Sequence, residues 1–383
     1  MDLTRVSDYN EHFEMINYID CYNDSPDELK IKRGLVYDKN TSDILIPSFA
    51  YTDVYTMDDE EKIKDILQDF HDWNFFYSLE ATLLRVFYHE GSWHIITNKK
   101  LDAFRSRWSC RETFGQLFKD ALCKLFHKES ADVLEWFYQL LDKEKIYCFL
   151  IKSNSENRIV CHYKKDPIVY LGTLRKGGEF IHESGLPDIP EFQSFSTPAG
   201  VVVNDMTELG DAVNNVNCFE YQGVIVMHKS KNRQIKIMND EYKELFELRN
   251  NNPNLRFRYL ELRHDPIMVK KFYKLYPKYA DIFDTYEDAL HRIARIIYQF
   301  YVSRYIKNQF VTLPKEEFLV MKKCHDWYLQ DRLNNKIFSK VVFEFLSQES
   351  PLNLYKMIRR LLINQDINKN NFYQGFQLMN DLN

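Results

Sequence analysis

The chain has 383 residues, of which 45% are hydrophobic and 15% aromatic, which excludes a disordered protein and allows two or three domains with full cores. Its net charge of −5 excludes a uniformly basic chain, and its 11 glycines and 11 prolines exclude a collagen-like one. The charge is uneven, because residues 266–383 hold 18 Lys and Arg against 12 Asp and Glu, whereas the preceding residues balance at −11. Solvated helix faces and a nucleic-acid-binding region would both show this local basicity.

The seven cysteines are dispersed, and none forms a CxxC pair or a zinc-like cluster with histidine. An odd number of dispersed cysteines is typical of a reducing compartment, so we expect an intracellular, cytoplasmic protein without a metal site. The first residues, "MDLTRVSDYNEHFEM", are too polar for a signal peptide. No apolar run approaches the roughly 20 residues of a membrane span, so we expect no membrane partner.

The first half of the chain predicts alternating helices and strands. After a mixed N-terminal region, apolar residues at helical spacing predict a helix within residues 58–73. Residues 77–104 predict two strands joined by a tight turn at Gly91. Apolar stripes in residues 111–144 predict two further helices, broken near "HKES".

From Lys145 the period changes to two, which predicts short strands at "IYCFLI", "NRIVCHY" and "IVYLGTL". The stretch "STPAGVVVNDMTELGDAVNNV" predicts a strand and then a short helix with Thr207 as its cap, and a second hairpin turned at "KSKNR" follows. Beyond residue 265 the pattern is helical, with Asp284 and Glu287 at capping-box spacing and a helix start at Ser350. We therefore predict an α+β domain with antiparallel strands, a bent sheet and a cleft in residues 1–265, and an all-helical domain in residues 266–383.

Four β elements stand in an order that resembles the covalent nucleotidyltransferases, most closely the RNA ligases of the bacteriophage tRNA-repair type. They are "YSLEATLLRVF", "FLIKSNSENRIVCHY", "FEYQGVIV" and "QIKIMNDEY". The resemblance covers residues 75–250 and implies an antiparallel-sheet, ATP-grasp-like ligase domain. In active members it also implies ATP and Mg²⁺ as cofactors and RNA as a partner.

The charged groups that this family uses are mostly replaced. Aligned by the motifs, the lysine nucleophile falls on Ser78 and the metal-side glutamate on Gln222. The ribose-binding glutamate falls on Leu150 or Ile151, and of the two late lysines Lys236 is kept. The second of those lysines falls on Met238 and the motif glycine on Ala81, whereas the scaffold positions Asn157, Arg158, Gly223, Asp240 and Tyr242 are retained.

Lysine adenylation needs a nucleophilic amine and charged groups around the phosphates and the metal. Ser78 cannot form a lysyl-phosphoramidate, so no catalytic residue is assigned and no cofactor is expected. The hairpin of residues 77–104 is expected to line a former nucleotide pocket. The candidate pocket residues are Ser78, Glu80, Arg85, Gln222 and Lys236.

Residues 98–108 ("NKKLDAFRSRW") combine four Lys and Arg with two aromatic residues, a mixture that can contact RNA phosphates and stack on bases. A charged helix start would look the same. Arg292, Arg295, Arg304 and Lys307 offer a second cationic face, which a solvated helix also explains. The RNA-binding candidates are Lys99, Lys100, Arg105, Arg107, Asn157 and Arg158.

The sequence leaves three functions open. The first is a catalytically degenerate RNA-ligase-like protein that retains RNA or protein binding. The second is an active ATP-dependent RNA ligase in which Lys99, Lys100 or Lys236 serves as the nucleophile. The third is a structural or virion scaffold protein, since the Phe/Tyr-rich composition with dispersed cysteines is similar to that of proteins from large DNA viruses, whose compartment would be the host cytoplasm.

Overall fold

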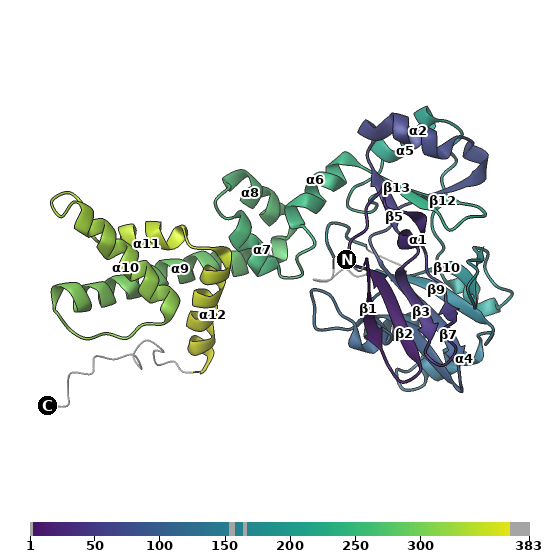
Figure 1. Cartoon of the computed structure of the whole chain (residues 1–383), viewed down its shortest axis with the longest axis horizontal. Helices are drawn as coiled ribbons and strands as arrows, with labels where there is room; N and C mark the ends of the chain where they lie inside the picture. The colour runs from purple at the N-terminus through teal and green to yellow at the C-terminus, as the bar shows by residue number, and fades with distance from the viewer. Residues whose placement is uncertain (1–2, 153–157, 164–166, 368–383) are drawn as a thin grey trace. The chain divides into compact units, whose positions relative to one another are not determined.

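A computed structural model of the chain describes residues 3–152, 158–163 and 167–367. The chain divides into two compact units, residues 1–253 and residues 254–383, here called unit 1 and unit 2 (Figure 1). The fold is mixed α+β with antiparallel sheets and a helical C-terminal region, as predicted. The domain boundary expected after residue 265 falls inside unit 2, beyond helix α7 (Leu255–Leu262).

In the part of unit 1 that the structure describes, the strands form three sheets rather than one bent sheet. Sheet A has the order β1 (Thr4–Tyr9), β2 (Phe13–Tyr18), β3 (Arg33–Asp38), β4 (Ile44–Ile46). Sheet B has the order β5 (Thr52–Tyr55), β13 (Gln234–Met238), β12 (Gly223–His228), β6 (Trp73–Tyr77), with β5 and β13 parallel. Sheet C has the order β11 (His182–Glu183), β10 (Ile168–Arg175), β9 (Lys145–Ile151), β7 (Thr82–His89), β8 (Ser92–Ile96).

Sheet C is buried on both faces. One face packs against α3 (Phe114–Phe126) and α4 (Val133–Gln139) through a core that includes Leu84 and Val86. The other face shares a core with sheet A, to which Phe87 contributes. Double burial explains why β7 and β9 are nearly continuous apolar runs instead of alternating ones.

Helices α2 (Glu60–Leu67) and α5 (Met206–Asn214) cover one face of sheet B. The two helices lie side by side at the top of Figure 1. On its other face, register aligns Val54, Lys236, Ile225 and Phe76 in one row across the four strands. Each of these side chains is half-buried. This incompletely covered face carries the lysine that the sequence singled out.

Both predicted hairpins are confirmed, as are the helices in residues 58–73 and 111–144 and the strands β9 and β10. The strand predicted in residues 157–163 is wrong for its described part, because Arg158–Tyr163 form no strand. The strand expected in "STPAGVVV" is reduced to two isolated bridges, one between Ser196 and Val169 and one between Gly200 and Phe76.

Two of the three predicted helix starts were also wrong. The side chain that caps α5 is Asp205, which accepts from the backbone N–H of Glu208, rather than Thr207. Asp284 and Glu287 do not start a helix, because α9 (Ala280–Tyr301) begins at Ala280 and their carboxylates bind Tyr273, Tyr259 and Arg263 instead. Ser350 does precede a helix, and its hydroxyl accepts from the N–H of Asn353.

Unit 2 consists of helices packed around α9, whose apolar stripe includes Leu290, Ile293 and Ile297. A π-helical segment, Val302–Ile306, continues α9. The other helices are α8 (Pro266–Leu275), α10 (Lys315–Gln330), α11 (Ser339–Ser347) and α12 (Pro351–Ile367), while α1 (Asp27–Lys30) and α6 (Asp240–Arg249) belong to unit 1. Within the described ranges, no helix is both long and apolar enough to cross a membrane.

Candidate functional site

Four of the five candidate pocket residues lie in one hydrogen-bonded network. Oε1 of Gln222 accepts from the hydroxyl of Ser78 and from Nζ of Lys236, each at 3.0 Å. Nε2 of Gln222 donates to the Tyr242 hydroxyl at 2.9 Å, and that hydroxyl donates to Oε2 of Glu80 at 3.0 Å. Ser78, Glu80, Gln222 and Lys236 are therefore joined through Tyr242, and we call these five residues the Gln222 network.

The network lies where three strands of sheet B begin or end. The ladder continues past the strands, because Ser78 donates its N–H to Gly223 and Gln222 donates its N–H to Ser78. Gly223 has φ +135°, and a Cβ there would lie 2.1 Å from the carbonyl oxygen of Ile237. Only glycine tolerates this close approach of β12 to β13. The approach places Gln222, the residue before Gly223, beside the end of β13.

Tyr242 is held by the start of α6. The side chain of Asn239 caps this helix by accepting from the N–H of Tyr242 at 3.0 Å, and its amide donates to the carbonyl of Val213. Burial, together with Glu80 and Cys161, raises the pKa of Tyr242 above its usual range, so the hydroxyl stays protonated. It can therefore donate to Glu80 while it accepts from Gln222.

Glu80, in the loop between β6 and β7, is enclosed by donors. Its carboxylate accepts backbone N–H groups from Ile159, Val160 and Cys161 as well as the Tyr242 hydroxyl. These four donors match the roughly four lone-pair sites of a carboxylate. The segment predicted as a strand uses its N–H groups on Glu80, and the carboxylate has no site left for a metal ion without displacing one of them.

A second contact holds the loop between β6 and β7 at Glu80. The backbone N–H of Glu80 donates to the hydroxyl oxygen of Tyr163, with 2.6 Å between the nitrogen and that oxygen. The carboxylate and the backbone of Glu80 thus both meet residues 159–163. The sequence motif "ENRIVCHY" signalled this segment, although not its contact with Glu80.

Lys236 is a cation with neutral partners. Burial and the nearby Arg33 lower the pKa of Lys236 to about 8, against the smaller opposing effects of Glu80 and Cys161. Arg33 itself donates to the carbonyl of Ala50 at 3.1 Å and to Oγ1 of Thr52 at 3.2 Å. Among the described residues, no ion pair joins Lys236 or Arg33 to a carboxylate. No motif in the sequence indicated Arg33 as a neighbour of this site.

Arg85, the fifth pocket candidate, lies elsewhere. Its side chain is fully buried on the face of sheet C that packs against sheet A. The guanidinium donates to the carbonyl oxygens of Pro47, Gly34 and Thr97. Burial lowers the pKa of Arg85 to about 10. The structure therefore separates Arg85 from the Gln222 network and gives it contacts that hold two sheets together.

The RNA-binding candidates of residues 98–108 are on the surface of unit 1. Lys99, Arg105 and Arg107 are exposed, and Lys100 is half-exposed with its Nζ 3.5 Å from Asp8. Phe104, between them, is 37% exposed. Arg158 donates to the carbonyl of Val160 at 3.0 Å, and Asn157 lies outside the described residues.

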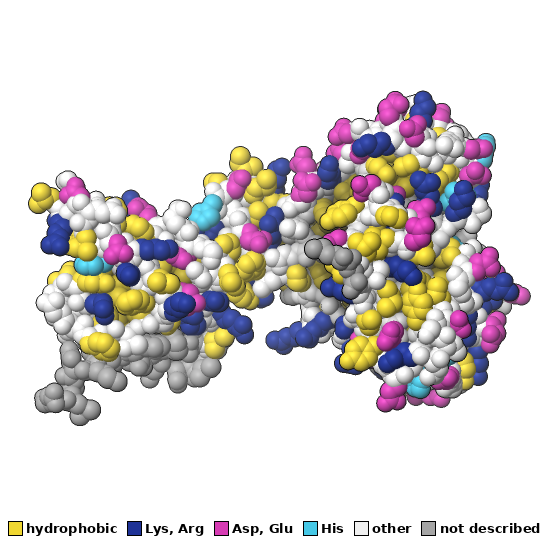
Figure 2. All heavy atoms as spheres, viewed as in Figure 1, with side chains coloured by type: hydrophobic (Ala, Val, Ile, Leu, Met, Phe, Trp, Pro, Cys, Tyr) yellow, Lys and Arg dark blue, Asp and Glu magenta, His cyan; other side chains and the backbone are white. Residues whose placement is uncertain are grey.

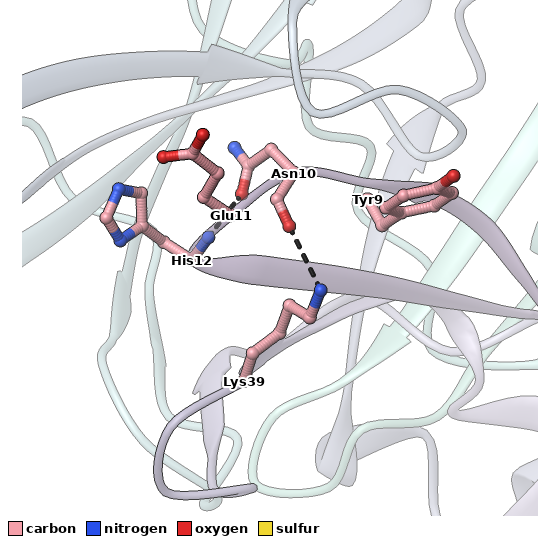
Figure 3. A pocket seen from close by; sticks show the side chains of 5 residues that line it. All are labelled: Tyr9, Asn10, Glu11, His12 and Lys39. Atoms are coloured by element: carbon pink, nitrogen blue, oxygen red, sulfur yellow. Dashed lines mark hydrogen bonds between the residues drawn. The ribbon is translucent and has the colours of Figure 1, made fainter.

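Within the described ranges, no group of three His, Cys, Asp or Glu side chains could hold a metal ion. One open depression is lined by residues of two neighbouring turns, Tyr9, Asn10, Glu11, His12 and Lys39 (Figure 3). Asn10 links residues of both turns. Its carbonyl accepts from Nζ of Lys39, and its side chain accepts from the N–H of His12. No residue of the Gln222 network lines this depression.

Comparison with known proteins gives relatives but no family profile, since none matches the chain. The chain is 29% identical over 350 residues to the immediate-early protein ICP-46 homolog of Invertebrate iridescent virus 3, covering 88% of this chain and 74% of that protein. It is 25% identical to the corresponding homolog of Invertebrate iridescent virus 6, covering 78% and 68%. Immediate-early protein ICP-46 of Frog virus 3 is 26% identical over 195 residues, covering 48% and 49%.

Two solved structures match the chain with low scores. One is named as an ATP-dependent DNA ligase from Aquifex aeolicus, with a TM-score of 0.41, 11% identity and 85% coverage of both chains. The other is an archaeal ATP-dependent RNA ligase, with a TM-score of 0.40, 13% identity and coverage of 69% and 66%. Similarity at this level carries no argument about the function of the chain.

Proposed function

We propose that the chain is an RNA-ligase-like protein that does not form a covalent nucleotide adduct and whose surviving activity is RNA binding. The observation that carries this proposal is the Gln222 network. The position aligned with the nucleophile is a buried serine, whose hydroxyl donates to a neutral glutamine in the position aligned with a metal-side glutamate. The order of the four motifs supports the tRNA-repair type within the ligases.

The two positions of the network that align with the family's nucleophile and metal-side glutamate lack the groups that adenylation uses there. Neither Ser78 nor Gln222 supplies a nucleophilic amine or a metal-binding carboxylate. Glu80 is a carboxylate of the site, but four protein donors already occupy it. Losing one group that stabilises a transition-state charge typically costs about 2.7–4 kcal/mol, and losing the nucleophile removes the covalent step.

RNA binding is supported by the surface of residues 98–108, where Lys99, Arg105 and Arg107 are exposed beside Phe104. Exposed cations with an interleaved ring suit phosphate contact and base stacking. The relatives are named immediate-early proteins of viruses. We therefore also propose a viral protein that acts in the host cytoplasm early in infection.

The test of lost catalysis is incubation with α-labelled ATP, and separately GTP, with Mg²⁺ or Mn²⁺, followed by a denaturing gel. No labelled band is expected from protein shown to be folded by circular dichroism. An acid-labile band would overturn the proposal and would show that a lysine still serves as nucleophile. A known self-adenylating ligase in the same reaction is the positive control.

The test of RNA binding compares Arg105→Gln/Arg107→Gln with Lys64→Gln/Lys124→Gln, which removes the same charge from exposed positions of α2 and α3. Affinity of the unaltered chain for RNA is expected to fall steeply with salt, by about 0.7 in log–log slope for each phosphate contact on a single strand. Only the Arg105/Arg107 variant is expected to reduce that slope. RNA affinity absent at low salt, or equal in both variants, would count against this part.

A second function, an active ATP-dependent RNA ligase with an atypical nucleophile, is favoured by Lys236. Its lowered pKa increases the neutral, nucleophilic form, and its Nζ lies 3.0 Å from Gln222. This alternative would need ATP and Mg²⁺. It predicts a labelled band that Lys236→Arg abolishes and that Lys99→Arg/Lys100→Arg leaves intact. A structural or virion scaffold role is the alternative if neither nucleotide nor RNA binds.

A further inference from the structure

Unit 2 contains a ladder of stacked rings at the end of α9. The rings of Tyr305 and His325 are stacked with centroids 3.7 Å apart and planes at 11°. Tyr328, one helical turn further along α10, continues the ladder at 5.9 Å from His325 with planes at 30°. All three rings are half-exposed, whereas the neighbouring Tyr301 is buried at 4% exposure.

The backbone is distorted where the ladder begins. Tyr305 belongs to the π-helical segment Val302–Ile306, in which the N–H of Lys307 bonds the carbonyl of Val302, five residues back. Such segments are rare and are frequently found at functional sites. The wider turn changes the angular position of Tyr305 relative to a regular continuation of α9, and in this position its ring meets His325 of α10.

Cations flank the ladder. The guanidinium of Arg304 lies over the ring of Tyr305 at 5.6 Å and over that of Phe318 at 5.5 Å. Burial first, and then Arg332 and Arg304, lower the pKa of His325 against the opposing effect of Asp326. The imidazole is therefore neutral at pH 7 and acts as an aromatic ring between two tyrosines.

The charge of unit 2 agrees with these contacts. Residues 254–383 hold 21 Lys and Arg against 14 Asp and Glu, whereas the rest of the chain holds 30 against 42. In Figure 2, the Lys and Arg side chains of unit 2 lie among hydrophobic side chains on the face that is drawn. A polyanion with flat apolar groups is the ligand that combines both features.

We propose that Arg304, Tyr305, His325, Tyr328 and Arg332, the ring platform, bind single-stranded nucleic acid. Bases stack on the rings and the arginines contact phosphates, which is how sequence-tolerant single-strand sites are built. A duplex keeps its bases paired and cannot offer their faces. The platform is in unit 2 and does not depend on the proposed function of unit 1, whose RNA-binding candidates are in residues 98–108.

The test measures fluorescence anisotropy of labelled 12-nucleotide oligo(U), oligo(dT) and a 12-base-pair RNA duplex with the full chain. Tyr305→Leu and Tyr328→Leu are each expected to weaken oligo(U) binding about tenfold. His325→Phe keeps a flat ring and is expected to retain binding. The matched control is Phe338→Leu, which removes an exposed ring of the same unit that is not part of the ladder.

Three outcomes would overturn the proposal: unchanged affinity in both tyrosine variants, an equal loss in Phe338→Leu, or a preference for the duplex. Binding of both oligo(U) and oligo(dT) would support stacking, and preference for oligo(U) would add contacts to the 2′-hydroxyl.

Ultraviolet cross-linking of 5-bromouridine RNA to the unaltered chain needs no variant to fold. Cross-linked peptides are expected within residues 301–332. Cross-links confined to unit 1, together with a loss of binding only in Arg105→Gln/Arg107→Gln, would overturn the platform and leave the proposed function of unit 1 standing.

Discussion

The hydroxyl of Tyr242 donates to the carboxylate of Glu80 across 3.0 Å, and the two residues are 162 positions apart in the chain. This bond joins two groups that would otherwise be separate. On one side Glu80 gathers the backbone N–H groups of residues 159–161. On the other side Tyr242 accepts from Gln222, which holds Ser78 and Lys236. The site of unit 1 is thus one continuous hydrogen-bonded network that contains a single carboxylate, Glu80.

The backbone N–H groups of residues 159–161 that bind the Glu80 carboxylate are here called the Glu80 cradle. Replacing that carboxylate by an amide tests how much the cradle contributes to stability. In Glu80→Gln the amide nitrogen would face N–H donors, so at least one backbone N–H of residues 159–161 would lose its acceptor. Hydrogen bonds to a charged group contribute about 1.5–3 kcal/mol each, and we expect the free energy of unfolding to fall by about 3 kcal/mol. The measurement is the urea midpoint at unchanged m-value.

The matched control is Glu220→Gln, an exposed glutamate two positions before Gln222, which is expected to change stability by less than about 0.5 kcal/mol. Equal effects of the two substitutions would mean that Glu80 is solvated in solution and that the cradle does not hold residues 159–161.

The lowered pKa of Lys236 predicts a pH dependence with a definite sign. The folded-state pKa is about 8 and the usual value is 10.5, so between these pH values the unfolded chain binds more protons than the folded one. Stability therefore rises with pH across this window, and the penalty of holding the cation is fully present below pH 8. The Lys236→Met variant has no ammonium group at this position, so it lacks this pH-dependent destabilisation.

The stability of the unaltered chain relative to Lys236→Met is expected to increase by about 1 kcal/mol from pH 8 to pH 10.5, after allowance for solvent screening of a side chain that is only partly buried. The difference between the two urea midpoints is measured at each pH, which cancels the titration of other groups. Lys64→Met, on the exposed face of α2, should show no such trend. If the difference between the unaltered chain and Lys236→Met did not change with pH, Lys236 would not be a buried cation without a carboxylate partner.

Gln222→Glu restores a carboxylate at the centre of the network and should abolish that trend. The new carboxylate would accept from Nζ of Lys236 at the distance now seen for the amide oxygen, 3.0 Å. An ion pair at this distance raises the lysine pKa toward or above its usual value. Gln139→Glu, at an exposed position of α4, is the control. An unchanged trend between pH 8 and pH 10.5 in Gln222→Glu would show that Lys236 does not face this position.

The sequence predicted the parts of the site that depend on motif order. The sequence groups Ser78, Glu80, Arg85, Gln222 and Lys236 as pocket candidates, and the structure joins all of them except Arg85 in one network. That this network is a nucleotide site stays a prediction. The two hairpins were predictable because a tight turn and flanking β-rich runs are local signals.

Features that depend on long-range contact were not predictable. The Glu80 cradle turns residues 159–161 away from a strand by bonds that span about 80 positions, which no local pattern encodes. Sheet A was not predicted, although β1, β2 and β3 have six residues each, and its buried residues, such as Phe13 and Val36, share a core with sheet C. Arg85 was assigned to the pocket because charge in a strand indicates an exposed or functional face, but β7 is buried on both sides.

Arg85 provides the last prediction, which separates a structural from a ligand-binding role. Its guanidinium donates to three backbone carbonyls, and Gly34 allows that approach, because a Cβ at Gly34 would lie 3.0 Å from Nη2 of Arg85. Arg85→Met leaves the carbonyls without this donor but also removes a buried charge, so the two effects oppose each other. We expect the loss of the bonds to dominate and the free energy of unfolding to fall by about 2–4 kcal/mol.

The control is Arg107→Met, at an exposed position, which should change the free energy of unfolding by less than about 0.5 kcal/mol. RNA affinity at a temperature where both variants are folded should be unchanged in Arg85→Met and reduced in Arg107→Met, and the opposite pattern would return Arg85 to the binding site.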